Sequence, residues 1–267
     1  MSLLSEVDDY LHAAPLSGAY GEEVGPFTLF RSTSPWPYYA RPRPGVEQTI
    51  QAADIERLRE RCAELEIPLA IEWVVETCPS LSAAAAEAGL EVVEHPLLVL
   101  DEADFKPATT AATCTILPAV ESVLREARAV PNVAFGDPGT AIGAGGVAER
   151  DQEAAKIPDS MMEFLLKRAT AGYSVTAGAA TEDGLVASGV HQPVGTASEI
   201  VGVATLPAMR RQGLGAAVTS CLAEHAFAMG VQLLLLSAES DAVAAVYERI
   251  GFRRIGYAGA AEVPSAD

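Results

Sequence analysis

The chain has 267 residues, 49% of them hydrophobic and 20% charged, a length that favours two compact domains and a composition that excludes a largely disordered chain. Acidic residues outnumber basic ones by 36 to 18, which gives a formal charge of −18. That charge argues against nucleic acid and anionic membranes as partners, and it suits a cationic ligand. The alternative interpretation is that the acidity only keeps the protein soluble.

The first 45 residues are rich in Gly and Pro, and we expect them to form extended chain or loop. Four prolines between residues 34 and 45 exclude a helix in that stretch. Apolar residues then recur at three- and four-residue spacing, which predicts a helix over 53–65. The elements expected next are a strand over 69–75, a helix over 80–88 ended by Gly89, a strand over 90–100 and a connection over 101–110.

A second series of elements begins at residue 111. The elements expected first are a strand over 114–117, a helix over 119–129, a Gly-rich loop between 136 and 146 and a helix over 159–169. Turn signals then separate three apolar segments, which predicts an antiparallel meander of strands over 173–179, 185–191 and 197–205.

A helix over 213–229 separates this meander from an almost unbroken apolar run over 231–236, which is typical of a strand buried on both faces. The intervening helix predicts that this strand and the last strand of the meander are parallel neighbours. A helix over 242–250, stopped by Gly251, and a strand over 253–258 follow. The same order of apolar strand, capped helix, Gly and strand occurs around Gly89, which indicates a degenerate duplication.

The segment Arg210-Arg211-Gln212-Gly213-Leu214-Gly215 joins a predicted strand to a predicted helix. A Gly-x-Gly pair alone is weak evidence, and Gly143-Ala144-Gly145 is another such pair without this setting. Between a strand and a helix, however, glycines allow close backbone approach, and the free amides at the helix start bind phosphate. Arg210 and Arg211 add positive charge in an acidic chain, as a polyanionic ligand requires. An ordinary turn with two surface arginines is the alternative interpretation.

The same segment resembles the signature of the GNAT superfamily of acyl-CoA N-acyltransferases. In that signature Arg or Gln is followed by two residues, Gly, one residue and then Gly or Ala, and Arg210-x-x-Gly213-x-Gly215 satisfies it. The resemblance extends to residues 199–207 before the loop and 246–252 after it, and it covers roughly 111–258. It implies an α+β fold, in which helices flank a mixed and mainly antiparallel sheet.

We expect this GNAT-like fold in a complete copy over 111–267 and in a degenerate copy over 1–110. The degenerate copy has no phosphate loop, and Ala85 stands at the position equivalent to Tyr247. Its expected work is to cover the active site. Three aromatic residues are candidates for a substrate wall, with packing in an interdomain core as the alternative: Trp36, Tyr38 and Tyr39.

The resemblance implies that acetyl-CoA is the donor and that its acetyl group passes to a primary amine, of a small molecule or a peptide, by direct attack. No metal is implied. The strand before the loop would hold pantetheine through its backbone, and the loop amides would hold the pyrophosphate. The cofactor-binding residues expected on this basis are Val203, Ala204, Thr205, Arg210, Arg211, Gln212, Gly213, Leu214, Gly215 and Ala216.

Two residues are candidates for catalysis. Tyr247 resembles the tyrosine that many members place near the CoA sulfur, where a phenol can protonate the departing thiolate; core packing is the alternative. Glu199 resembles the general base of the histone acetyltransferase branch, and an exposed carboxylate at a strand start is the alternative. A base is needed because an amine with a pKa of about 10.4 must lose a proton before it attacks. His191 is a reserve candidate for relaying that proton.

The remaining signals concern location and partners. The four cysteines show no paired spacing, so the sequence predicts neither a zinc site nor a disulfide framework. No export signal or membrane-length apolar stretch is evident, and we expect a cytoplasmic protein that can form an oligomer. Two other functions fit the same loop: a non-catalytic acyl-CoA binding or sensing protein, and an N-acyltransferase that moves a longer acyl group to amino acids or peptides.

Overall fold

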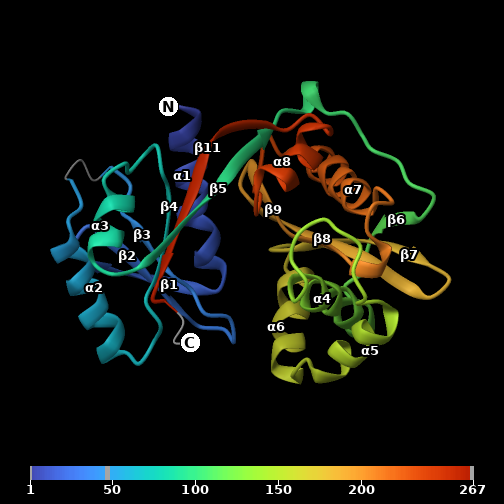
Figure 1. Cartoon of the computed structure of the whole chain (residues 1–267), viewed down its shortest axis with the longest axis horizontal. Helices are drawn as coiled ribbons and strands as arrows, with labels where there is room; N and C mark the ends of the chain where they lie inside the picture. The colour runs from blue at the N-terminus through green and yellow to red at the C-terminus, as the bar shows by residue number, and fades with distance from the viewer. Residues whose placement is uncertain (1, 46–48, 265–267) are drawn as a thin grey trace. The chain divides into compact units, whose positions relative to one another are not determined.

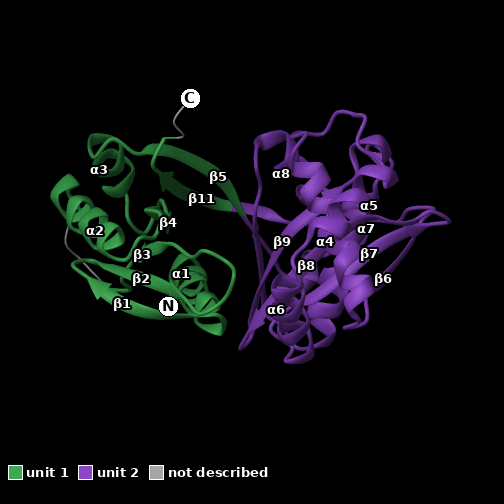
Figure 2. Cartoon of the chain, turned by 90° about the horizontal axis from the view of Figure 1, so that it is seen from below, with its two compact units in different colours: residues 1–97, 255–267 green, residues 98–254 purple. Residues whose placement is uncertain are grey.

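A computed structural model describes residues 2–45 and 49–264. The described residues form two compact units (Figure 2). The first contains the chain up to Leu97 and again from Ile255, and the second runs continuously from Leu98 to Arg254. The expected assignment of residues 1–110 and 111–267 to a degenerate and a complete copy stays a prediction.

The first unit is a mixed sheet with helices on both faces. Its strands follow the order β1-β2-β3-β4-β11-β5, in which β3 is parallel to β4 and β11 is antiparallel to it. Side chains of α2 and α3 form an apolar core with one face of these strands, while α1 lies on the other (Figure 1). The elements are α1 (Leu3–Ala13), β1 (Ala19–Val24), β2 (Phe27–Ser32), β3 (Ala40–Pro42), α2 (Ala52–Glu64), β4 (Ala70–Val74), α3 (Leu81–Glu87), β5 (Glu91–Leu100) and β11 (Arg253–Glu262).

The expectation of loop throughout the first 45 residues is wrong. Ser2 caps α1 by accepting a hydrogen bond from the backbone of Ser5, and buried residues recur along the helix at Val7, Tyr10 and Leu11. Strands β1 and β2 form a hairpin whose turn contains Gly25, with a φ of 57°. The prolines of residues 34–45 exclude a helix only within that stretch, and they do not exclude helices or strands in the residues before it.

The second unit is a sheet in the order β10-β9-β8-β7-β6. Every pairing among these strands is antiparallel except that of β9 with β10, which is parallel. Helix α7 lies on one face of the sheet and α4 on the other (Figure 1). The elements are η2 (Glu102–Asp104), β6 (Thr113–Ile116), α4 (Glu121–Phe135), α5 (Val147–Lys156), α6 (Asp159–Thr170), β7 (Val175–Thr181), β8 (Gly184–Val194), β9 (Ala197–Thr205), η3 (Pro207–Met209), α7 (Leu214–Ala228), β10 (Leu233–Ser237) and α8 (Asp241–Glu248).

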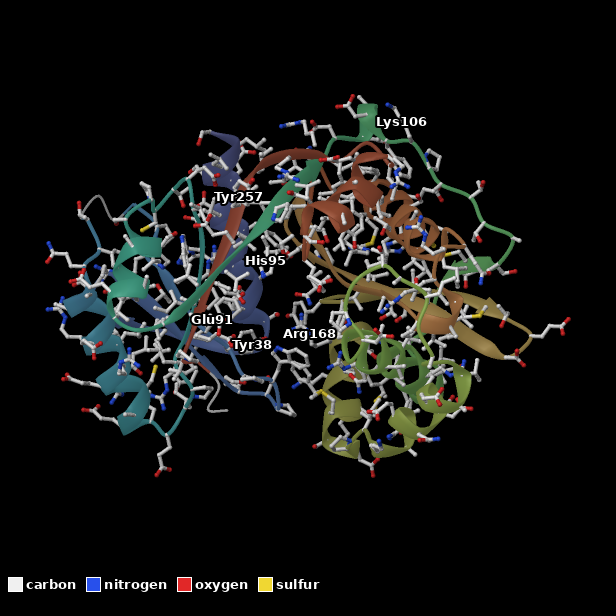
Figure 3. All side chains as sticks on the ribbon, viewed as in Figure 1. Tyr38, Glu91, His95, Lys106, Arg168 and Tyr257 are labelled. Atoms are coloured by element: carbon white, nitrogen blue, oxygen red, sulfur yellow. The ribbon has the colours of Figure 1, made fainter. Side chains whose placement is uncertain are left out.

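These pairings confirm the predicted meander, the parallel strand after it and the mixed α+β class. Helix α4 continues to Phe135 through a buried proline, Pro131, and is longer than predicted. Helix α5 was not predicted because its sequence is polar and only Arg150 is buried. Arg168 on α6, labelled in Figure 3, donates to the carbonyl of Tyr173 at 3.3 Å and so holds the end of that helix near β7.

The two predicted helix endings have the same backbone geometry. Gly89 and Gly251 both have left-handed φ angles, of 75° and 111°. Beyond each glycine, an amide reaches back to the helix: Leu90 donates to the carbonyl of Ala85 at 3.0 Å, and Phe252 donates to that of Tyr247 at 3.2 Å. This local match places Ala85 at the position equivalent to Tyr247, and the duplication itself stays a prediction.

Candidate functional site

Strands β9 and β10 pair over a short distance and β9 then continues without that pairing. The parallel register runs from Ala197 opposite Leu233 to Glu199 opposite Leu235, whereas β9 extends to Thr205. On its other edge, β9 pairs with β8 as far as Thr205, with an irregularity near Gly202, whose φ is 61°. The far end of β9 therefore leaves one backbone edge available on the side of β10.

A cavity of about 690 Å³ lies within the second unit at this end of β9. Its volume falls within the range of about 300–1,000 Å³ that is typical of small-molecule sites. The lining comes from α4 and the loop after it, β9, the loop before α7 and the first turn of that helix, and α8 with the residues that flank it. The lining residues are Ala134, Phe135, Pro138, Gly139, Thr140, Val203, Ala204, Thr205, Arg210, Arg211, Gly213, Leu214, Gly215, Ala216, Glu239, Ala242, Val243, Val246, Tyr247 and Arg249.

The start of α7 lines this cavity and has the features of an anion-binding site. Gly213 precedes the helix in the left-handed conformation, with a φ of 76° and a ψ of 6°, and Arg211 is also left-handed at 68°. The first amides of a helix have no intrahelical acceptor, and the first turn of α7 contains no acidic residue that would occupy them. These amides can therefore bind a phosphate group.

The charged residues of the lining are three arginines and one glutamate, a local excess of positive charge in a chain of formal charge −18. The two arginines of the loop differ in setting. Arg211 is exposed, whereas Arg210 is 9% exposed and donates to three backbone carbonyls of the segment that ends α4. The guanidinium of Arg210 is therefore held by the protein itself.

Tyr247 lines the cavity from α8 and is 8% exposed. Its ring packs edge-on against Phe252, with the ring centroids 6.0 Å apart. Burial raises the pKa of Tyr247 to about 12, because a phenolate would be poorly solvated there. The phenol is protonated at neutral pH and can donate a hydrogen bond into the cavity.

The cavity brings together most of the site residues predicted from the sequence. They are Val203, Ala204, Thr205, Arg210, Arg211, Gly213, Leu214, Gly215, Ala216 and Tyr247. Gln212 is exposed in the loop but is not part of the lining, and Glu199 lies where the pairing of β9 with β10 ends, also outside the lining.

Sequence reasoning missed one wall of this cavity, formed by the end of α4 and the loop after it. It also missed Glu239, in the turn before α8. The wall follows an unpredicted extension of α4 and has no hydrophobic periodicity. A Pro-Gly pair at Pro138 and Gly139 was its local signal, but that pair predicts only a turn.

His191 is buried beside a partly buried histidine, His225, and is not part of the cavity lining. Its Nδ1 lies 2.9 Å from the hydroxyl of Ser198, and its Nε2 lies 3.0 Å from Nδ1 of His225 on α7. Burial, and then the charge of His225, lower the pKa of His191 to about 4. This setting favours the structural interpretation of His191.

Acid should therefore destabilise the protein through His191. The pKa of His191 is 6.5 in the unfolded chain and about 4 in the folded protein. Between these two pH values the unfolded chain binds a proton at this residue that the folded chain does not bind. The free energy of unfolding should fall as the pH is lowered through this range, by up to about 3 kcal/mol from this residue. Urea unfolding at pH 7 and pH 5 measures the effect, and the fall should be smaller in His191→Gln. An equal fall in both proteins would contradict the assignment.

The described residues contain no helix long and apolar enough to cross a membrane. Within the same residues, no group of three or more His, Cys, Asp or Glu side chains is placed to hold a metal ion. All four cysteines are free.

A family model matches one segment of the sequence, and solved structures match the fold of the chain. Residues 179–259 match the family model of FR47-like proteins. Among curated proteins, none matches the chain significantly.

Solved structures with the same fold are numerous, and their sequences have diverged widely. A GCN5-related N-acetyltransferase from Kribbella flavida is 19% identical with a TM-score of 0.74, over 100% of this chain and 97% of that one. A GCN5-related N-acetyltransferase-like protein from Streptococcus suis is 10% identical with a TM-score of 0.55, over 97% and 99%. A tandem GNAT protein from the clavulanic acid biosynthesis pathway is 14% identical with a TM-score of 0.54, over 90% and 79%. At these identities the likeness establishes the fold.

Proposed function

Because this chain has the fold of the GNAT superfamily, as its loop predicted, we propose that it is an N-acetyltransferase that moves an acetyl group from acetyl-CoA to a primary amine. The observation that carries the proposal is the cavity at the end of β9 that is not paired with β10, with the free amides of α7 at its edge. Acetyl-CoA, when bound, supplies a thioester carbonyl that an amine can attack and a thiolate that can leave.

The residues of the cavity suit the chemistry of coenzyme A. The amides at the start of α7 match a pyrophosphate, with Arg211 and Arg249 adding positive charge. The backbone of Val203–Thr205 offers hydrogen-bonding groups to the amides of pantetheine, as the resemblance implies. The excess of acidic residues elsewhere in the chain would attract a cationic acceptor, which a protonated amine is.

In this proposal Tyr247 acts on the leaving group. Its phenol keeps its proton at neutral pH, and it lies in the lining of the same cavity as the phosphate loop. A hydrogen bond from the phenol to the sulfur would stabilise the negative charge that develops there. We assign Tyr247 this donor role, with the proton passing to the sulfur as the thiol leaves.

Glu199 is the proposed base for the amine, directly or through water. Glu199→Gln should then lower kcat at pH 7 by about 100-fold, the lower end of the usual effect of a general base. The loss should shrink as the pH approaches 10, because free amine becomes abundant without a base. A pH profile of kcat from pH 7 to 10 for both proteins provides the measurement. A loss that is the same at every pH would instead assign the residue a structural role.

An acceptor screen tests the proposed function. Wild-type protein is incubated with acetyl-CoA and, in turn, polyamines, aminoglycosides, amino acids and peptides, and release of free thiol is followed. Amine-dependent release is the expected result. Tight CoA binding without turnover on any amine would favour an acyl-CoA sensor. Faster turnover with longer acyl-CoA donors would replace acetyl transfer by transfer of a longer acyl group.

A further inference from the structure

The side chain of Arg210 donates three hydrogen bonds to backbone carbonyls beside the cavity. Its Nη2 donates to the carbonyls of Ala134 at 3.0 Å and Asp137 at 2.5 Å, and its Nη1 donates to that of Ala141 at 3.0 Å. These acceptors belong to the segment 134–141, which contributes five residues to the cavity lining and which we call the α4 wall. The planar guanidinium therefore fixes this wall at three points.

The Gly-rich segment after the wall packs directly on the turn that precedes Arg210. Gly143 donates to the carbonyl of Pro207 at 3.1 Å, and Ala208 donates to that of Gly145 at 2.9 Å. A Cβ at Gly143 would overlap the carboxylate of Asp137 and lie 2.9 Å from Cβ of Pro207, and one at Gly145 would lie 2.8 Å from Cγ1 of Val133. The pair Gly143-Ala144-Gly145, which lacks the setting of a phosphate loop, thus permits this close packing.

The electrostatics of the wall explain why a cation is needed there. The C-terminal end of a helix carries partial negative charge on its last carbonyls, and α4 ends at Phe135 in the cavity lining. That end would repel the phosphates of a ligand held by α7. Arg210 supplies a full positive charge to the carbonyls of Ala134 and Asp137 and so offsets the repulsion.

We propose that Arg210 is a positioning residue, which fastens and neutralises the α4 wall, and that Arg211 is the loop arginine that contacts the ligand phosphates directly. This inference deepens the proposed function, since it assumes that the cavity binds acyl-CoA. It assigns different tasks to two adjacent arginines of one motif. The difference follows from their settings, because Arg210 is buried among carbonyls and Arg211 is an exposed residue of the lining.

CoA binding without any amine tests this assignment. Calorimetry gives the Kd of CoA for wild type, Arg210→Lys and Arg211→Ala at low salt and at about 0.5 M salt, where surface charges are screened. Arg210→Lys keeps the positive charge but loses the planar guanidinium with its several N–H donors. We therefore expect about tenfold weaker CoA binding at both salt concentrations. Arg211→Ala should lose a similar factor at low salt, and most of that loss should disappear at high salt.

Hydrogen exchange and a second variant distinguish a positioning role of Arg210 from a general disruption of the fold. Amides of residues 136–146 should exchange faster in Arg210→Lys than in wild type, while kcat at saturating acetyl-CoA should stay within about threefold. Gly143→Ala, whose Cβ would crowd both Asp137 of the wall and Pro207 of the adjoining turn without a change in charge, should reproduce both the weaker binding and the faster exchange.

The positioning role would be overturned if Arg210→Lys bound CoA and exchanged its amide hydrogens as the wild type does. It would also be overturned if the loss of CoA affinity in that variant disappeared at high salt. Neither result would contradict acetyl transfer. Failure of the wild type to bind CoA would overturn both the positioning role and the proposed function. Amine turnover is not needed for these measurements, so the absence of an acceptor would count against the proposed reaction alone.

Discussion

Tyr247→Phe should lower kcat by about 100-fold while changing the KM for acetyl-CoA little. The substitution removes one hydroxyl and keeps the ring, so packing against Phe252 is retained. A group that acts on the leaving sulfur contributes chiefly in the transition state, and loss of such a donor typically costs about 100-fold or more. Steady-state kinetics with the best acceptor from the screen measure both constants.

The raised pKa of Tyr247 adds a second expectation to this experiment. With a pKa of about 12, the phenol should remain protonated up to pH 10, so its own ionisation should not produce a fall in kcat below that pH. Tyr173→Phe is the matched control because Tyr173 belongs to the same unit but is 49% exposed and outside the lining. Equal kcat values for wild type and Tyr247→Phe would show that Tyr247 only packs the core.

Gly213→Val should weaken CoA binding by at least about tenfold. The backbone of Gly213 is left-handed, which costs an L-residue about 1–2 kcal/mol and a β-branched residue more. A side chain there has room, since the nearest atom to a Cβ is the carbonyl oxygen of Thr109 at 4.0 Å. The loss would therefore come from the backbone, as the loop relaxes and the α7 amides turn away from the phosphates.

The other glycine of the motif provides the control. A Cβ on Gly215 would make ordinary contacts, at 3.6 Å with Thr205 and 3.9 Å with Val203, and Gly215 lies in the helix with no positive φ. Gly215→Ala should thus bind CoA within about threefold of wild type. Calorimetry compares the two variants. If Gly215→Ala loses as much as Gly213→Val, bulk in the cavity and not backbone conformation determines binding.

Predictions from the sequence were best where one pattern determines one structure. The apolar run that contains Leu233 and Leu236 has the length and composition of a buried strand, and the turn signals of the meander predicted antiparallel neighbours. The loop of residues 210–215 was placed between a strand and a helix in the same way, because the conformation of Gly213 depends on local sequence. Such features need little information from the rest of the chain.

The missed features depend on tertiary contacts. Helix α5 exposes most of its residues and is held through Arg150, which donates to the carbonyl of Leu185 at 2.6 Å, a contact that no local period encodes. The role of Arg210 was also invisible, because its three acceptors lie about seventy residues earlier in the chain. The motif placed this arginine correctly in the cavity lining but could not show which groups it binds.

The route of the chain through its two units affects the order in which they can form during synthesis. The second unit is continuous, whereas the first needs β11, whose Ala258 pairs with Val74 of β4. On the ribosome, the edge of β4 must therefore wait until residues 253–262 have been made. Until then it is an unpaired strand edge, the kind of surface that chaperones protect and that aggregation exploits.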